Sequence, residues 1–294
     1  MSDTVAATES ANERTRGLDL MEAEALVALL AREQLEAMTA VERATPAIAR
    51  AVHAIVGRLR AGGRLHYFGA GTSGRIASLD AAECPPTFGT PPSLVVAHIA
   101  GGSEALVRAV EGAEDDATAG AREACEAVVV ADAVVGISAG GGAPYVLGAI
   151  DAARSLGAFT IGLTSVAGSA LARGAELAIV VETGAEPIAG STRLKAGTAQ
   201  KLVLNALSTA TMVRLGRVYD NLMVDVVATN AKLGARALRL VGTLAGVSRE
   251  RAEELLRHAG GSVKIAVVME RRGVDADGAR ELLAGSGGFL RPLL

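Results

Sequence analysis

The chain has 294 residues, of which 50% are hydrophobic and 21% are charged, so a disordered or low-complexity chain is excluded. Its 29 Lys and Arg residues face 32 Asp and Glu residues, which gives a net charge of -3. That balance provides no basic field for nucleic acid or for an anionic membrane surface, and it favours a site for a small ligand.

Two cysteines, Cys84 and Cys125, occur without a CxxC motif or a pair of histidines at ligand spacing. This pattern predicts neither a disulfide framework nor a metal site, and it indicates a reducing compartment. The first 17 residues have no apolar core of the signal-peptide type, so we expect a cytoplasmic protein. The apolar stretches 133–150 and 155–172 are interrupted by glycines, Pro144 or polar residues, which favours buried strands and short helices over a membrane span.

The chain begins with a polar arm, residues 1–17, and apolar residues then recur at helical spacing from Leu18 to about Arg60. We expect two helices there, the second of which ends at Gly62-Gly63. Short apolar runs then alternate with glycine loops and helical segments, which is typical of a three-layer α/β fold with a parallel, flavodoxin-like sheet. In such a fold, ligands bind at the carboxyl ends of the strands. The expected strands are residues 64–68, 94–99, 133–137, 159–163 and 177–181.

A long helix is predicted over residues 194–215, and an internal repeat lies near the end of the chain. Its copies, residues 246–261 and 273–288, share a Gly-Val start, a helical segment and a closing glycine pair, with Ser248 and Asp275 as expected N-caps. Two copies are too few for a solenoid, so they predict a small helical appendage. The expected division is an N-terminal arm with helices over 1–53, a central sheet domain over 54–217, and a linker with a small helical domain over 218–294.

The segment Gly69-Ala70-Gly71-Thr72-Ser73-Gly74 follows an expected strand, precedes an expected helix and fits the GxGxxG pattern. A dinucleotide site would require a carboxylate at the end of the second strand, and LVVAHIAGG is followed by none before Glu104. The same geometry can hold a phosphate through free N–H groups at the helix start, with the Thr72 and Ser73 hydroxyls as further donors. A tight turn in which Ser73 is only the N-cap is the alternative.

Two more loops have ligand-binding composition. Ser191, Thr192 and Lys195 lie in GSTRLKAGT, residues 190–198, where hydroxyls and cations at a helix start suit a phosphate or sugar hydroxyls. Helix capping with a solvated Lys195 is the alternative. The third glycine loop, SAGGGAPY, covers residues 138–145 and follows the third expected strand. Three such loops at successive strand ends favour a ligand site over three unrelated turns.

Carboxylates are the second class of candidate. Glu83 precedes Pro85 and Pro86, which are expected to stop a helix within a residue or two, and a carboxylate at a helix C-terminus opposes the dipole by about 0.3–1 kcal/mol. A residue that costs stability suggests a function. Glu114 lies in the acidic run EGAEDD, which by itself is typical of a solvated helix start.

Together these segments resemble the N-acetylmuramic acid 6-phosphate etherases, a family of the sugar isomerase (SIS) domain superfamily. The resemblance runs over nearly the whole chain, and its longest motifs, GAGTSGR and GSTRLKAGTAQK, are too specific for chance. The segments that carry it are TESANERTRGLD, GRLHYFGAGTSGRIASLDAAECPPTFGTPP, AHIAGG, EGAED, GSTRLKAGTAQKLVLNALST and YDNLMVDVVATNAKL.

The resemblance implies cleavage of the D-lactyl ether of N-acetylmuramic acid 6-phosphate with water, which gives N-acetylglucosamine 6-phosphate and D-lactate in the recycling of cell-wall sugars. It also implies a SIS domain, a homodimer, and no metal or other cofactor. The catalytic carboxylates of the family fall on Glu83, as the acid, and Glu114, as the base. Partial burial or a nearby charge would keep Glu83 protonated near neutral pH. The expected contacts to the phosphosugar are Gly71, Thr72, Ser73, Ser138, Ser191, Thr192 and Lys195.

Two segments depart from the family pattern. The third loop usually reads Ala-Ser-Gly-Arg-Thr-Pro-Tyr, whereas residues 139–145 here lack its serine, arginine and threonine side chains. Ala11 stands where the N-terminal motif usually has an arginine. Loss of charged hydrogen bonds lowers ligand affinity by about 1–3 kcal/mol each, so the phosphate contacts of this loop are expected to differ from those of the family.

Two other functions are open to this superfamily. Glucokinase regulatory proteins bind sugar phosphates without turning them over, but they have two sugar isomerase domains and this chain has room for one. An aldose-ketose isomerase would share the base and would not require the lactyl group. The presence of both Glu83 and Glu114 favours catalysis by the etherase reaction, since a binding protein requires neither an acid nor a base.

Overall fold

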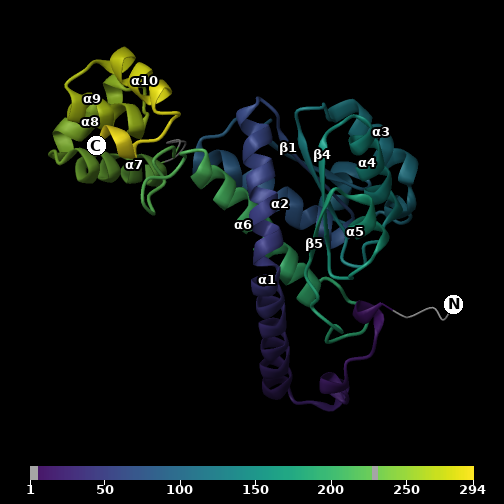
Figure 1. The fold of residues 1–294 in the computed structure, drawn as a ribbon. Coiled ribbons are helices and arrows are strands. Elements are labelled where there is room, and N and C mark those ends of the chain that lie inside the picture. The colour runs from purple at the N-terminus through teal and green to yellow at the C-terminus, as the bar shows by residue number, and fades with distance from the viewer. Residues whose placement is uncertain (1–5, 227–230) are drawn as a thin grey trace. The chain divides into compact units, whose positions relative to one another are not determined.

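The computed structural model describes residues 6–226 and 231–294, which form two compact units (Figure 1). The sheet unit contains the described residues up to Ala81 and residues 93–208, and the helical unit contains residues 82–92 and 209–294 as far as they are described. This division differs from the expected boundaries because residue 53 lies inside a helix and residues 82–92 join the C-terminal part. The first five residues of the expected arm, and residues 227–230 of the expected linker, lie outside the described residues.

The sheet unit is built on five parallel strands in the order β2-β1-β3-β4-β5. All residues of β1 and β3 are buried, which is typical of strands covered on both faces. The predicted strands are confirmed to within one residue at each end. Their bounds are β1 (Leu65–Gly69), β2 (Val95–Ile99), β3 (Ala133–Ile137), β4 (Phe159–Thr164) and β5 (Leu177–Val180).

Helices cover both faces of the sheet, as expected. On one face, α4 contacts β1, β3 and β4, and α3 packs on α4, while on the other face α1 contacts β3 and β5 (Figure 1). The middle of α2 is fixed to β1 through the Tyr67 hydroxyl, which donates to Asp80 at 3.0 Å. The bounds are α1 (Ala23–Arg60), α2 (Gly71–Phe88), α3 (Ala117–Ala127), α4 (Pro144–Ser155), α5 (Ala170–Gly174) and α6 (Lys195–Arg214). Short 3-10 helices are η1 (Ala7–Glu9), η2 (Glu13–Thr15), η3 (Leu18–Leu20), η4 (Gly102–Leu106), η5 (Ala113–Asp115) and η6 (Arg291–Leu293).

The prediction of two helices before the sheet is wrong, because α1 is one helix of 38 residues. The sequence between the two apolar runs, AREQLEAMTAVERATPA, is rich in Ala, Glu, Gln, Leu and Arg, which have high helix propensity. Pro46 lies inside this helix and removes one backbone hydrogen bond without ending it. The long helix predicted over 194–215 is confirmed as α6.

The helical unit confirms the repeat. Ser248 accepts a hydrogen bond from the Arg251 amide at 3.3 Å and Asp275 accepts one from the Gly278 amide at 2.9 Å, so both predicted N-caps are formed. The two capped helices flank α9 and bury a common apolar core with α7. The bounds are α7 (Ala231–Ala245), α8 (Arg249–His258), α9 (Val263–Arg272) and α10 (Ala276–Gly285).

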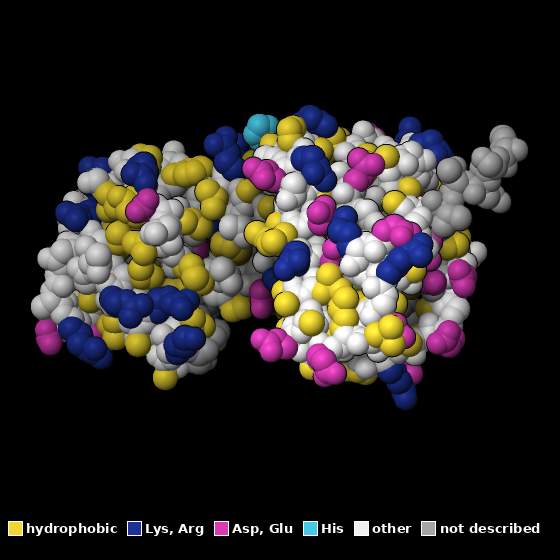
Figure 2. Space-filling view, turned by 90° about the horizontal axis from the view of Figure 1, so that it is seen from below, with side chains coloured by type: hydrophobic (Ala, Val, Ile, Leu, Met, Phe, Trp, Pro, Cys, Tyr) yellow, Lys and Arg dark blue, Asp and Glu magenta, His cyan; other side chains and the backbone are white. Residues whose placement is uncertain are grey.

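The surface has mixed charge. On the face seen in Figure 2, Lys and Arg side chains lie among Asp, Glu and hydrophobic side chains rather than in one continuous field. Within residues 6–226 and 231–294, no helix combines the length and the apolar character that crossing a membrane requires.

Candidate active site

A cavity of about 410 Å³ lies in the sheet unit where β1 and β3 end. These two strands are neighbours in the sheet, and the chain leaves them in opposite directions along the strand order, so the cavity occupies the topological switch point. We call it the sugar cavity. Its lining residues are Glu9, Ala70, Gly71, Thr72, Ser73, Glu114, Asp115, Ile137, Ser138, Ala139, Gly140, Gly142, Ala143, Pro144 and Thr192.

The turn from β1 into α2 supplies one wall of this cavity. Gly71 has a φ of +53°, which favours glycine, and it begins α2 with its first amides free of intrahelical partners. The Ser73 hydroxyl donates to the Gln200 side chain of α6 at 3.0 Å, which fixes this wall to α6. Thr72 is half-buried beside them. Free N–H groups at a helix start and nearby hydroxyls form the kind of cradle that binds a phosphate.

The loop between β3 and α4 forms the opposite wall. Ser138 is buried and accepts a hydrogen bond from the Gly141 amide at 3.1 Å. Gly141 has a φ of +69°, and a side chain there would clash with Ser169 and Thr164. A Cβ atom built at Gly140 or Gly142 would have no other heavy atom within 4 Å. Of the three loop glycines, only Gly141 is therefore required by the structure. The positions of Gly140 and Gly142 have room for the serine and the arginine of the family pattern.

Carboxylates of two elements line the sugar cavity. Glu114 and Asp115 come from η5 and Glu9 comes from η1 of the N-terminal arm. Glu114 is exposed, which leaves its carboxylate accessible from the cavity. Glu9 was not among the candidate residues, although it lies in the TESANERT segment. No Lys or Arg is among the described residues that line this cavity, so an anion here would be held by backbone amides and hydroxyls.

Glu83 belongs to the helical unit and lies on the second half of α2. The prediction that Pro85 and Pro86 stop the helix within a residue or two is confirmed, because α2 ends at Phe88, and the Gly89 amide donates to the Pro85 carbonyl at 2.9 Å. Glu83 is exposed, so the expected partial burial is not found, and it is not among the described residues that line the sugar cavity. Its role as the acid stays a prediction. Cys84 beside it is buried, as a small core residue would be.

The polar residues at and just before the start of α6 differ in their burial and in whether they line the sugar cavity. Thr192 lines the sugar cavity, whereas Ser191 is half-buried and outside its lining. Lys195 is fully buried, and its Nζ lies 3.3 Å from Glu33 Oε2. The expectation of a phosphate-contacting or solvated Lys195 is therefore not what the structure shows, because the ammonium group is used in an internal ion pair.

Glu33 of α1 is the centre of a buried cluster that fixes the N-terminal arm. It accepts hydrogen bonds from Arg14 at 2.7 and 2.9 Å and from Asn12 at 2.9 Å, in addition to the contact with Lys195. These hydrogen bonds, that of Arg14 above all, lower the pKa of Glu33 from 4.5 to about 2. The cluster keeps the arm against the chain next to the cavity.

The arm is also tied to the loop that precedes α6. Asn12 donates to the Ala185 carbonyl at 3.2 Å, Thr15 donates to the Pro187 carbonyl at 2.8 Å, and the Gly190 amide donates to the Thr8 carbonyl at 2.9 Å. Through these contacts the arm carries Glu9 to the wall of the sugar cavity.

Comparison with known proteins identifies the family. The chain is 49% identical to an N-acetylmuramic acid 6-phosphate etherase of Deinococcus radiodurans over 98% of its own length and 94% of the relative. The relative of the same name from Gloeobacter violaceus is 51% identical, with 96% of this chain and 93% of that protein covered. A family model of the glucokinase regulatory protein N-terminal SIS domain matches residues 47–154.

Solved structures support the fold. The phosphoheptose isomerase of Francisella tularensis aligns with a TM-score of 0.52 at 23% identity, over 66% of this chain and 100% of that chain. The phosphoheptose isomerase of Neisseria gonorrhoeae gives a TM-score of 0.51 at 19% identity, over 65% of this chain and 98% of the other. At these identities the likeness establishes a SIS-type α/β fold and nothing further.

Proposed function

We propose an etherase activity for this chain, which belongs to the family of N-acetylmuramic acid 6-phosphate etherases. The proposed reaction cleaves the D-lactyl ether of N-acetylmuramic acid 6-phosphate with water and yields N-acetylglucosamine 6-phosphate and D-lactate. It would take place in the cytoplasm, in the recycling of peptidoglycan sugars. Identity of about 50% to curated relatives over nearly the whole chain supports this assignment, and the sugar cavity with Glu114 in its wall is the observation that carries it.

The phosphosugar would occupy the sugar cavity. Its phosphate would bind the free amides at the start of α2, between Gly71 and Ser73, with the Thr72 hydroxyl as a further donor. Ser138 and the amides of the third loop would complete the contact from the β3 side, and Thr192 would face a sugar hydroxyl. Because no Lys or Arg is among the described lining residues, phosphate binding here would depend on amide geometry more than on net charge.

The chemistry requires a base and an acid. In the open-chain aldehyde form of the substrate, the carbonyl acidifies the proton on C2, and lactate at C3 is a poor leaving group. Glu114 would accept the C2 proton, the C2–H electrons would form the C2–C3 double bond, and the C3–O bond would break. Glu83 would protonate the ether oxygen, which becomes the hydroxyl group of the departing D-lactate.

Hydration completes the reaction with the roles reversed. Water adds to C3 of the unsaturated aldehyde while Glu83, now a carboxylate, accepts one of its protons. Glu114, now protonated, returns a proton to C2. Both carboxyl groups are thereby restored, and no electron donor or acceptor is consumed.

The proposal includes a homodimer. Several large apolar side chains on the α1 half that precedes Pro46 are exposed, among them Val27, Leu35 and Met38 at 65%, 59% and 57%. An apolar stripe of this kind on a helix is typical of a surface covered by a partner. Light scattering of the purified protein would give twice the chain mass of 29.7 kDa if the proposal holds, and the chain mass itself if it does not.

The first test is release of D-lactate from N-acetylmuramic acid 6-phosphate by the purified protein. In deuterated water, Glu83→Gln should still exchange the C2 proton but release no lactate, because only the acid is lost. Glu114→Gln should do neither. Glu126→Gln, an exposed carboxylate of α3 outside the cavity lining, serves as the control and should keep wild-type release.

Two outcomes would contradict this assignment. Normal lactate release by Glu83→Gln would remove Glu83 from the role of acid. Tight binding of the phosphosugar by the wild-type protein without lactate release would favour a regulatory binding protein, the class to which the matched glucokinase regulatory domain belongs.

A further inference from the structure

A second hollow of about 260 Å³ opens beside the sugar cavity within the sheet unit. We call it the side hollow. The two share Ala70, Gly71, Glu114 and Asp115, so their common wall is the start of α2 and the acidic segment of η5. The lining residues of the side hollow are Ala70, Gly71, Arg75, Ala100, Ala105, Ala109, Val110, Glu111, Gly112, Ala113, Glu114 and Asp115.

Arg75 is the distinctive residue of the side hollow. Among the described residues that line either hollow, it is the only Lys or Arg. It lies one helical turn after Gly71 on α2 and lines the side hollow but not the sugar cavity. Its Nη2 donates to the Arg108 carbonyl at 3.1 Å, which leaves further donors of the guanidinium group for a ligand.

We propose that the side hollow is the subsite for the carboxylate of the lactyl group, with Arg75 as its binding residue. This proposal rests on the etherase function proposed above. The substrate of that reaction has two anionic ends, a phosphate on the sugar and a carboxylate on the lactyl ether. The sugar cavity offers amides and hydroxyls for the first end, and the side hollow offers a guanidinium group for the second.

The position of Glu114 agrees with this arrangement. The proton on C2 and the ether bond at C3 lie between the sugar ring and the lactyl group, so the base must reach the boundary between the two binding regions. Glu114 lines both hollows and thus lies at that boundary. The smaller volume, about 260 Å³ against about 410 Å³, suits a three-carbon acid beside a sugar phosphate.

Charge gives an independent reason for the cation. The side hollow is also lined by Glu111, Glu114 and Asp115, which would repel a lactyl carboxylate placed among them. Arg75, the one Lys or Arg among the described residues of this lining, would offset part of this repulsion. The same contact would separate N-acetylmuramic acid 6-phosphate from N-acetylglucosamine 6-phosphate, which lacks the lactyl group and leaves the guanidinium group without an anion.

The test compares two substrates on two proteins. One substrate is N-acetylmuramic acid 6-phosphate, and the other is its analogue in which the lactyl carboxylate is a carboxamide. A charged hydrogen bond lost from an enclosed site lowers kcat/KM by about tenfold to a hundredfold. The wild-type protein should favour the acid over the amide by that factor, whereas Arg75→Gln should lose activity on the acid alone and turn over both substrates at similar rates.

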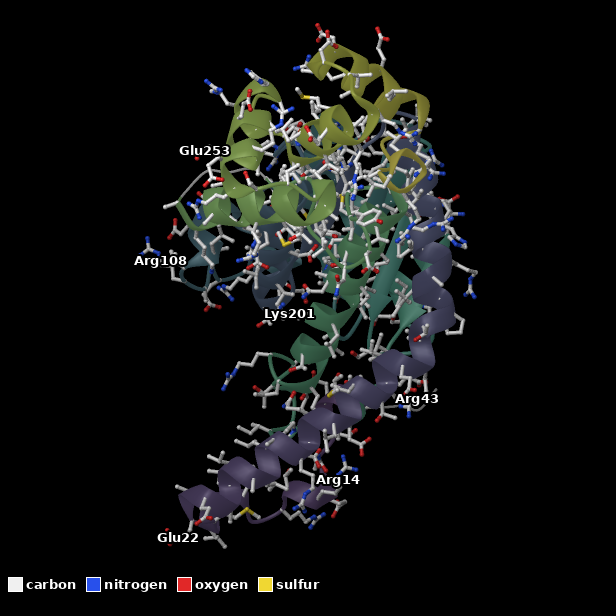
Figure 3. All side chains as sticks on the ribbon, turned by 90° about the vertical axis from the view of Figure 1, so that its left-hand side faces the viewer. Arg14, Glu22, Arg43, Arg108, Lys201 and Glu253 are labelled. Carbon is white, nitrogen blue, oxygen red and sulfur yellow. The ribbon has the colours of Figure 1, made fainter. Side chains whose placement is uncertain are left out.

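Arg108→Gln is the matched control. Arg108 follows η4, pairs with Glu104 at 2.8 Å and has a side chain that is 72% exposed, and it projects outward from the body in Figure 3. This variant should keep the wild-type preference for the acid. Binding of N-acetylglucosamine 6-phosphate, followed by calorimetry, should be equal in wild type and Arg75→Gln, because that ligand makes no contact in the side hollow.

Three results would overturn the proposal. Equal wild-type rates on acid and amide would show that the carboxylate is not recognised, and this measurement needs no variant. An equal loss on both substrates in Arg75→Gln would mean that Arg75 only holds the η5 segment through the Arg108 carbonyl. Unchanged kinetics of that variant would exclude any contact. In each case lactate release by the wild type would leave the etherase function standing, whereas no release at all would reject that function first.

Discussion

Two carboxylates, one in each unit, each lie near a lysine and an arginine, but their surroundings differ. In the sheet unit, Glu33 is 3% exposed and is the shared acceptor for Asn12, Arg14 and the fully buried Lys195. In the helical unit, Asp225 faces Lys264 at 2.8 Å and Arg217 at 3.4 Å.

The difference lies in which residue connects the cluster. Three donors depend on Glu33, so its loss would leave a buried ammonium group without an anion. Lys264 instead donates to two acceptors, Asp225 and the Gly288 carbonyl at 2.9 Å, and Asp225 keeps Arg217 when the lysine is removed. Buried ion pairs are costly to break when one partner stays charged and unpaired, and cheap to replace when none does. The two clusters should therefore respond very differently to mutation.

The largest effect is expected for Glu33→Gln. Removing the charge leaves Lys195 buried without its anion and weakens the Arg14 contact, which should lower the free energy of unfolding by about 3–5 kcal/mol. Because the cluster holds the arm that carries Glu9 to the sugar cavity, KM for the phosphosugar should also rise. Urea unfolding at pH 7 measures the first effect, and initial rates of lactate release measure the second.

Glu42→Gln is the control for that experiment, since Glu42 is an exposed carboxylate on the same helix. Its free energy of unfolding should stay within about 0.5 kcal/mol of wild type. A loss of less than about 1 kcal/mol in Glu33→Gln would contradict the central role given to Glu33.

A second prediction concerns acid. The pKa of Glu33 is about 2 in the folded chain, against an ordinary value of 4.5, so the folded protein binds this proton less readily than the unfolded chain does. The stabilisation is thus complete above pH 4.5 and is lost as the pH falls from 4.5 toward 2, by about 3 kcal/mol in total. Unfolding free energies from pH 6 to pH 3 should fall more steeply for wild type than for Glu33→Gln. Parallel curves would contradict the assignment.

The smallest effect is expected for Lys264→Met. Burial lowers the pKa of Lys264, which means that the folded environment disfavours its charge, and methionine fills a similar volume without that cost. The lost hydrogen bond to Asp225 is thereby partly offset, so the free energy of unfolding should fall by about 1–2 kcal/mol. Thermal unfolding would measure it. A loss as large as that of Glu33→Gln would show that the two clusters are equivalent after all.

Local sequence patterns predicted the fold well where burial is continuous. The apolar runs of β1 and β3 and the capped repeat helices follow from residues that are neighbours in the chain. The single helix α1 differs from the two helices expected over this stretch, because the residues between the two apolar runs favour helix.

The site was predicted less completely, because its contacts join distant parts of the chain. Gly71 and Ser138 follow strands and could be found from their loops. Glu9 and Arg75 could not, since nothing near them in the sequence shows that one lies in the sugar cavity and the other in the side hollow. Lys195 lies 162 residues from its partner Glu33 in the sequence. The residues next to a lysine do not show whether it is solvated or forms an ion pair with so distant a carboxylate.

The docking of the N-terminal arm also sets an order of assembly. The arm is synthesised before the rest of the sheet unit, but its Asn12 and Thr15 side chains donate to carbonyls 173 and 172 residues later in the chain. Contacts this distant form late, after the loop between them has closed. Glu9 can thus enter the cavity wall only when nearly all of the sheet unit has been synthesised, so a segment that is made early completes the cavity last.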